Sequence, residues 1–298
     1  TRCLSDWSSD VCSSDLVRFA GQTKLDGAWV LGVDSPVVRR LLDGEGGEPA
    51  RLEAAGRRVE RYAVGAEAAR LGAARWTAAD VRLEGRGSSW TALRDGRPVA
   101  PVRLSIPGRH NVANALAALA VAEIVGVDLE QAARSLAGFE GARRRFEVLA
   151  DRCGVMVVDD YAHHPTEIAA TIRAARQGYP DRRVVAVFQP HRYHRTAELM
   201  EPLAEAFDEA DAVVLTEIYA PPPERPIPGV DGQALYRRVV ERPAWQGRAT
   251  RAAFCPTLED AYARALEEAT PGTLLLVMGA GNVTRLAHRL AQSLQARG

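Results

Sequence analysis

From Arg144 to the end of the chain, short runs of apolar, often β-branched residues alternate with amphipathic segments of helical length. Each run is apolar throughout, which is typical of strands that are covered on both faces. The alternation predicts a parallel sheet with helices on both sides, a doubly wound α/β fold whose ligands bind at the carboxyl ends of the strands. The strands are expected at 154–158, 183–188, 212–216 and 274–278, and the helices near 165–176, 196–210, 232–241, 257–268 and 282–296.

The preceding part of the chain has a mixed pattern. Strand-like runs occupy 28–33 and 58–64, and alternating runs at 88–94 and 97–106 flank Asp95-Gly96, a strong signal for a tight hairpin turn. Helices are expected at 111–125 and 128–136. Because the pattern changes near Gly138–Arg144, we predict one domain over 17–140 and a second over 141–298.

The first sixteen residues fit neither pattern. They read TRCLSDWSSDVCSSDL, repeat Ser-Ser-Asp, and show no helical or strand period. The segment resembles a translated cloning adapter, so we expect 1–16 to be non-native or disordered and assign it no function.

Composition limits the classes of partner. The 38 basic and 38 acidic residues cancel, which argues against a general nucleic-acid or membrane binder. The four cysteines lie at no metal-ligand spacing, and no signal peptide or run long enough to span a membrane is evident, so a cytoplasmic protein is expected. Lys24 is the only lysine, and no Gly-x-x-x-x-Gly-Lys-Ser/Thr phosphate loop occurs.

Polar chemistry collects in three short segments, which hold five of the six histidines. Two of them, 159–165 and 189–196, directly follow predicted strands, where the ligand crevice of a doubly wound fold lies. Arginine and histidine together suit an anionic ligand, because guanidinium groups match carboxylate and phosphate oxygens. The candidate residues of these two segments are Tyr161, His163, Arg192 and Arg195.

Each candidate also has a purely structural explanation. Asp159 or Asp160 could cap the helix from Pro165, Asn111 or Asn114 could cap the helix they open, and Arg143–Arg145 could be a solvated charge run. The histidines could be surface loop residues. His191 and His194 have a workable metal-ligand spacing, but the adjacent arginines would repel a cation, so no metal site is predicted here.

Gly279-Ala280-Gly281-Asn282 follows the last predicted strand and opens a helix. It resembles the start of a dinucleotide-binding fingerprint, but the third glycine and a ribose-binding acid are absent. A tight strand-to-helix turn is therefore the favoured interpretation, and a nicotinamide-dependent oxidoreductase is disfavoured.

Read together, four segments resemble the Mur ligase family. They are IPGRHNVANALAA at 106–118, GARRRFE at 141–147, DDYAHHPTE at 159–167 and FQPHRYHRT at 188–196. The last segment is most similar to the members that join L-alanine to UDP-N-acetylmuramate. The match runs from about Phe19 to the end of the chain.

The resemblance implies three domains, of which the C-terminal one is Rossmann-like. Residues 17–140 would be the C-terminal part of the central α/β ATPase-type domain and 141–298 the C-terminal domain. The uridine-nucleotide-binding domain, the phosphate loop and the protein ligands of Mg²⁺ would lie upstream, so the chain alone is expected to be inactive. The implied reaction is ATP-dependent amide formation through an acyl phosphate in peptidoglycan synthesis.

The resemblance also implies residue roles. His110, Asn111 and Asn114 would line the adenine pocket, an arginine of the pair Arg144 and Arg145 would reach the nucleotide phosphates, and Asp160 would bind the ribose hydroxyls. Tyr161, His163, Arg192 and Arg195 would face L-alanine and the acyl phosphate, with His163, Arg192 and Arg195 the catalytic group. The alternative from another class is a non-catalytic module that binds a nucleotide or a peptidoglycan precursor.

Overall fold

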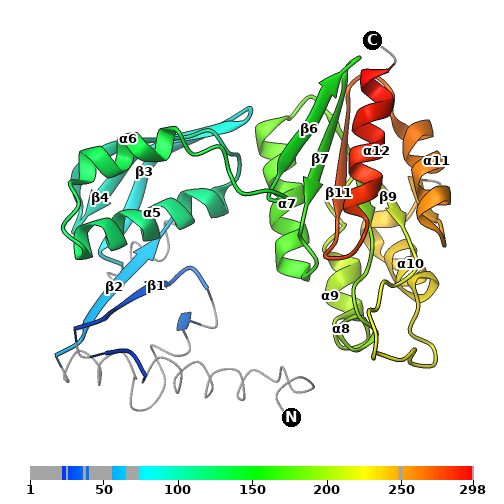
Figure 1. Cartoon of the computed structure of the whole chain (residues 1–298), viewed down its shortest axis with the longest axis horizontal. Helices are drawn as coiled ribbons and strands as arrows, with labels where there is room; N and C mark the ends of the chain where they lie inside the picture. The colour runs from blue at the N-terminus through cyan, green and yellow to red at the C-terminus, as the bar shows by residue number, and fades with distance from the viewer. Residues whose placement is uncertain are drawn as a thin grey trace. The chain divides into compact units, whose positions relative to one another are not determined.

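The computed structural model describes residues 22–24, 26–35, 38–39, 56–64, 74–247 and 251–296. The chain divides into two compact units, Thr1–Glu140 and Gly141–Gly298, each with its own sheet (Figure 1). Residues 1–16 lie outside the described part. Among the described residues, no helix combines the length and the apolarity that crossing a bilayer requires.

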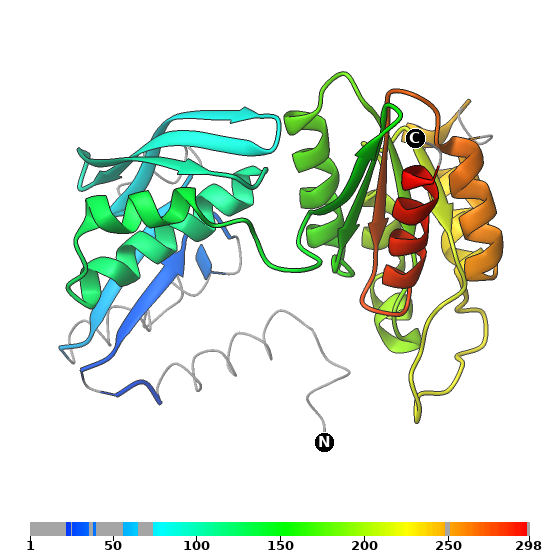
Figure 2. The ribbon, with the colours of Figure 1, turned by 45° about the horizontal axis from the view of Figure 1, so that its top comes forward.

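The first unit holds a five-stranded sheet in the order β1-β2-β3-β4-β5. Its first three strands are parallel and the last three form antiparallel pairs, with α5 and α6 side by side against the sheet (Figure 2). Asp95 and Gly96 both have positive φ, 50° and 75°, as the predicted primed hairpin turn requires. The elements are β1 (Ala28–Gly32), β2 (Arg58–Ala63), β3 (Trp76–Glu84), β4 (Gly87–Arg94), β5 (Arg97–Leu104), α5 (Arg109–Ile124) and α6 (Leu129–Ala137).

The second unit contains a six-stranded sheet in the order β10-β9-β8-β11-β7-β6. All neighbours are parallel except β6, which pairs antiparallel with β7. The strands are β6 (Glu147–Arg152), β7 (Val155–Asp160), β8 (Arg183–Phe188), β9 (Ala212–Leu215), β10 (Ala252–Phe254) and β11 (Thr273–Met278). The helices are α7 (Pro165–Gly178), α8 (Tyr193–Glu198), α9 (Met200–Glu205), α10 (Gly232–Glu241), the short 3₁₀ helix Pro243–Trp245, α11 (Leu258–Glu268) and α12 (Thr284–Gln295).

Successive residues of the central strands enter two different cores. Val158 packs in the core that contains residues of α7, α9 and α10, whereas Val157 packs in the core with α11 and α12. Because side chains alternate across a strand, an apolar residue at every position buries both faces of the sheet. This arrangement confirms the predicted doubly wound α/β fold.

Three strands were not predicted, and one predicted helix is divided. The additional strands are β3, β6 and β10. β6 joins β7 through a tight turn at Cys153-Gly154, whose φ values are 53° and 75°. This pair of residues is not a usual hairpin signature. The helix expected at 196–210 is replaced by α8 and α9, which meet at Leu199. Pro202 explains the division, since proline has no N–H to donate to the preceding turn and its ring clashes with that turn's carbonyl.

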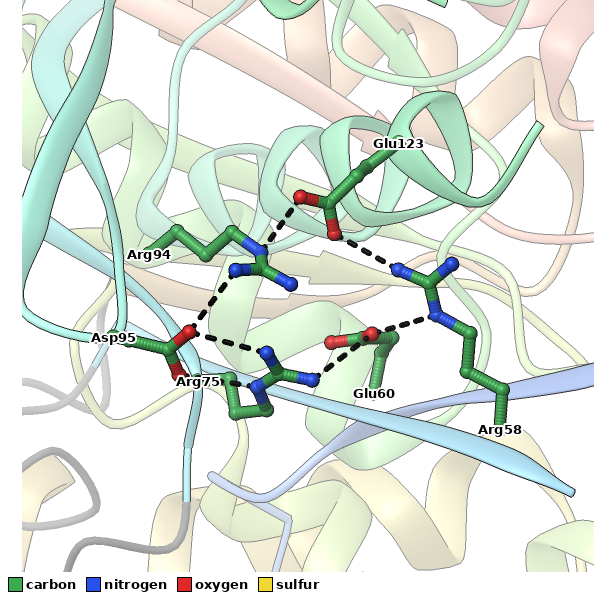
Figure 3. A network of polar contacts seen from close by, with 6 residues as sticks. All are labelled: Arg58, Glu60, Arg75, Arg94, Asp95 and Glu123. Atoms are coloured by element: carbon green, nitrogen blue, oxygen red, sulfur yellow. Dashed lines mark hydrogen bonds and ion pairs between the residues drawn. The ribbon is translucent and has the colours of Figure 1, made fainter. Parts of the chain in front are cut away.

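A closed ring of six alternating charges fastens the first unit (Figure 3). Its ion pairs run from Arg58 to Glu60, Arg75, Asp95, Arg94, Glu123 and back to Arg58, with N–O distances from 2.7 to 3.4 Å. The ring joins β2, the entry to β3, the β4–β5 turn and α5. Glu60 is completely buried, and among the described residues the charges of Arg58 and Arg75 offset the cost of burying it.

The ring yields a stability prediction. Replacing Glu60 by Gln removes the buried charge that both Arg58 and Arg75 contact, so we expect the free energy of unfolding to fall by about 2 kcal/mol in urea denaturation. The control is Glu130→Gln, which breaks an ion pair to Arg134 whose side chains are 70–71% exposed. That change should cost less than about 0.5 kcal/mol. Equal losses in the two variants would show that the ring does not hold this unit together.

Candidate active site

Four connections meet at the carboxyl edge of the second sheet. They are 161–164 after β7, 189–192 after β8, 216–231 after β9 and 279–283 after β11. Because these four strands are parallel, their carboxyl ends share one edge, which is where open α/β sheets bind ligands.

The two histidine-bearing loops contact each other at this edge. The rings of His163 and His191 lie edge to face with centroids 6.2 Å apart, and Tyr161 lies edge to face with His163 at 5.1 Å. His191 in turn stacks on Tyr219 from the β9 connection, at 5.8 Å. The topology therefore brings together His163 and His191, which lie 28 residues apart in the sequence, as the position of their two loops after parallel strands predicted.

His163 has a defined orientation. Its Nδ1 lies 2.9 Å from the carbonyl oxygen of Tyr161 and 3.4 Å from Glu167 Oε2, so we assign the proton to Nδ1 as a donor to these oxygens. This assignment leaves an acceptor lone pair on Nε2. Glu167 also accepts the backbone N–H groups of His163 and His164; burial would raise the pKa of Glu167, but these donors and nearby cations lower it.

His191 orients Arg195. Its Nδ1 is 3.1 Å from Nη1 of Arg195, which makes the imidazole the acceptor. Burial, together with the charges of Arg195 and Arg192, lowers the pKa of His191 to about 4. His191 is therefore neutral at physiological pH and can accept this hydrogen bond. Burial and the charge of Arg192 also lower the pKa of Arg195.

Arg192 has an unusual backbone conformation. Its φ is 73°, a left-handed value that is uncommon for a side chain with a Cβ, and its N–H donates to the carbonyl of Tyr219 at 3.0 Å. Its side chain is exposed at the start of α8. Strained non-glycine residues tend to cluster at functional sites, where the surrounding structure holds them in place.

The neighbouring arginines Arg144 and Arg145 have different surroundings. Arg144 donates to the carbonyl of Gly279 at 2.5 Å, lies 3.5 Å from Asp159 and sits over the Tyr161 ring at 4.8 Å. Its side chain is only 23% exposed, whereas that of Arg145 is 51% exposed and has Glu167 at 3.7 Å. Arg144 is thus held by the protein, while Arg145 remains accessible.

The Asp160 side chain is buried and accepts hydrogen bonds from the backbone of other residues. Its two carboxylate oxygens accept N–H groups of Ala162 at 2.7 Å and Phe146 at 2.8 Å. Burial raises the pKa of Asp160 to about 6, although the two backbone donors act to lower it. The alternative that Asp159 or Asp160 caps α7 is wrong, because the N-cap of that helix is His164. Asp159 instead accepts a hydrogen bond from the Thr284 hydroxyl at 2.6 Å. The ribose contact of Asp160 stays a prediction.

The Gly279–Gly281 segment makes a crowded turn. A Cβ on Gly281 would lie 2.5 Å from Gln189 Oε1 and 2.8 Å from the Tyr219 ring. Gln189 is itself buried and accepts the N–H of Val283 at 3.2 Å. Close packing between loops thus accounts for glycine at this position, in agreement with the predicted tight turn.

His110, Asn111 and Asn114 lie in the first unit, on the first two turns of α5. The expectation that one asparagine caps this helix is wrong, because the helix begins at Arg109 after Gly108. Asn111 instead donates to the Pro107 carbonyl at 2.7 Å, and His110 and Asn114 are exposed. Their contribution to an adenine pocket stays a prediction.

Sequence reasoning missed several members of the site. From the sequence, His191 has no individual role beyond its membership of a histidine-rich segment and a rejected metal-ligand spacing, and Glu167, Tyr219 and Glu224 are not singled out. A signal was present for His191 and Glu167, which fall inside the recognised segments, but the β9 connection carries no comparable motif. In the described part of the chain, no group of three or more His, Cys, Asp or Glu side chains is placed to hold a metal.

The chain is similar in sequence to known proteins. Residues 144–281 match the family described as Mur ligase, glutamate ligase domain. The UDP-N-acetylmuramate–L-alanine ligase of Symbiobacterium thermophilum is 44% identical over 280 residues, 94% of this chain and 55% of that protein. The chain thus spans about half the length of the curated relatives it matches.

Solved structures show the same fold. UDP-N-acetylmuramate–alanine ligase from Thermotoga maritima aligns with a TM-score of 0.62 and 24% identity, covering 86% of this chain and 57% of that one. Folylpolyglutamate synthase of Mycobacterium tuberculosis, solved with ADP and AMPPCP, aligns with a TM-score of 0.63 and 20% identity, covering 88% and 54%. Residues 144–281 of this chain therefore belong to the Mur ligase family, as its glutamate ligase domain.

Proposed function

We propose that the protein to which this chain belongs joins L-alanine to the carboxylate of UDP-N-acetylmuramate at the expense of ATP. A carboxylate oxygen of the muramate attacks the γ-phosphorus of ATP, giving an acyl phosphate and ADP. The L-alanine nitrogen then attacks the acyl carbon, phosphate leaves, and the nitrogen loses a proton. The products are the amide, ADP and phosphate, in keeping with the names of the relatives. Because the reaction consumes ATP, we expect it to take place in the cytoplasm.

The observation that carries this proposal is the clustering of cations at the carboxyl edge of the second sheet. Arg192, Arg195 and Arg145 border the loops where His163 and His191 meet. Among the described residues, Glu167 and Glu224 are the carboxylates that act on the Arg195 guanidinium. An excess of guanidinium groups suits reactants that carry a carboxylate and phosphates, because bidentate hydrogen bonds hold and orient these planar or tetrahedral anions.

The site residues are assigned the following roles. Arg192 and Arg195 bind the L-alanine carboxylate and stabilise charge on the acyl phosphate, and Tyr161 lines the same space. Of the arginine pair, Arg145 reaches the nucleotide phosphates, since the Arg144 guanidinium already binds Gly279 and Asp159. Asp160 binds the ribose, and His110, Asn111 and Asn114 contact the adenine.

His163 is proposed to accept the amine proton. With Nδ1–H directed at the Tyr161 carbonyl and Glu167, Nε2 is the free acceptor. A neutral imidazole in this tautomer can remove a proton from the nitrogen as the amide bond forms.

Mg²⁺ remains a prediction for the whole enzyme. The described residues provide no cluster of side chains that fits the ion, so no step is assigned to it through them.

Arg192 provides a direct test of the amino acid site. Activity is measured in a chimaera that joins the part of the Symbiobacterium thermophilum ligase before its match to residues 17–298 of this chain. Arg192→Ala removes charge-assisted hydrogen bonds to the L-alanine carboxylate, so kcat/KM for L-alanine should fall roughly 100-fold. Arg173→Ala, at an exposed arginine of α7 that pairs with Glu209, should retain parental activity. Equal activity of both variants would contradict the assignment.

The proposed role of His163 is tested by measuring kcat of a variant. In the same chimaera, His163→Gln should lower kcat roughly 100-fold, because the variant lacks a basic nitrogen to take the amine proton. KM for ATP should stay unchanged. His194→Gln, at an exposed histidine of α8, is the matched control. Full activity of His163→Gln across the pH range would remove the proposed role.

The neutral state of His191 can be measured directly by NMR titration of its ring. Arg195→Gln should raise the pKa of His191 from about 4 towards its ordinary value of 6.5, because a repelling charge is lost while burial remains. Between about pH 4 and pH 6.5 the unfolded chain binds this proton more readily than the folded chain does. The parental fold therefore loses stability as the pH falls through this range, and the variant loses less. An unchanged pKa would show that Arg195 does not face His191.

A further inference from the structure

The connection between β9 and α10 is attached to the arginine-bearing loop. The N–H of Tyr219 donates to the Pro190 carbonyl at 2.9 Å, and the N–H of Arg192 returns a hydrogen bond to the Tyr219 carbonyl at 3.0 Å. His191 stacks on Tyr219 between these two bonds. Residues that follow Tyr219 are therefore held beside Arg192 and the first turn of α8.

Glu224 occupies this position. Its Oε1 accepts the backbone N–H of His194 at 3.0 Å, and His194 lies between Arg192 and Arg195 in the sequence. Its Oε2 is shielded from solvent and, among the described residues, has no hydrogen-bond partner. A carboxylate oxygen that is removed from water without a donor costs free energy, so its presence beside a ligand site calls for an explanation.

The charges around Glu224 indicate what that oxygen can bind. The carboxylate is close enough to Arg195 and His191 to raise the pKa of each, although within the described residues it forms no ion pair with either. Glu167, the other acid that acts on Arg195, is already engaged by the N–H groups of His163 and His164 and by Arg145. Glu224 Oε2, by contrast, accepts no hydrogen bond from the described residues.

We propose that Glu224 binds the ammonium group of the amino acid whose carboxylate is held by Arg192 and Arg195. The two charged groups of an α-amino acid are joined through a single carbon, so an ammonium-binding acid must lie next to the carboxylate-binding arginines, as Glu224 does through His194. Glu224 then distinguishes an α-amino acid from a simple carboxylate. This inference rests on the proposed function.

The test compares two ligands that differ only in the ammonium group. L-alanine and propionate are titrated into the chain, and the ring signals of His163 and His191 are followed by NMR. The parental chain should bind L-alanine roughly 10-fold to 100-fold more tightly than propionate, the contribution of a hydrogen-bonded charge pair. Glu224→Gln should remove this preference by weakening L-alanine alone.

The glutamine variant separates recognition from structure. Its amide oxygen can still accept the His194 N–H, so the fold of the loop is preserved. Glu198→Gln removes the same charge from an exposed site on α8 and should keep the full preference for L-alanine. If Glu224→Gln weakens both ligands equally, or leaves the preference intact, Glu224 does not bind the ammonium group.

Two further outcomes distinguish this inference from the proposed function. If both ligands bind the parental chain equally tightly and Arg192→Ala abolishes both, the amino acid site stands and the role of Glu224 is wrong. If neither ligand perturbs the histidine signals, the amino acid site itself is contradicted, and the inference with it. In the chimaera, Glu224→Gln should raise KM for L-alanine roughly 10-fold or more and leave KM for ATP unchanged.

Discussion

The buried carboxylate of Asp160 holds the candidate site together. The carboxylate accepts the backbone N–H groups of Phe146 and Ala162. The backbone carbonyl of Asp160 accepts the N–H of Gly279. Two other chain segments, at Phe146 and Gly279, are thus joined to the end of β7 by this one residue. The rise in its pKa to about 6 shows that burial outweighs the two hydrogen bonds in setting its protonation. The arrangement therefore has an energetic cost near neutral pH, where the group carries its charge.

Arginine side chains have different surroundings in the two units. In the first, Arg58, Arg75 and Arg94 alternate with acids in a closed ring, so each guanidinium has carboxylate partners. In the second, Arg192 and Arg195 lie close together, and the pKa of Arg195 is lowered by burial and by its neighbour. Partnered arginines stabilise a fold, whereas cations with little nearby negative charge favour an anionic ligand.

His191 shows how neighbouring residues tune the site. Its ring is stacked on Tyr219 and bonded to Arg195, and its pKa of about 4 keeps it neutral at physiological pH. A protonated ring at this place would add another positive charge and could not accept from the guanidinium. Burial and repulsion thus convert a titratable side chain into a fixed hydrogen-bond acceptor that aims Arg195.

The sequence by itself determined the class of the second fold and the edge at which its loops gather, because apolar runs of strand length and helical periodicity are local properties. It also determined the Asp95-Gly96 hairpin, since positive φ at two successive residues is a local demand. Only the tertiary structure decided that Arg144 is held inside while Arg145 is accessible, that Asp159 and Asp160 serve other segments than α7, and that Glu224 lies beside α8. These distinctions depend on contacts between residues far apart in the chain, which local composition and spacing do not encode.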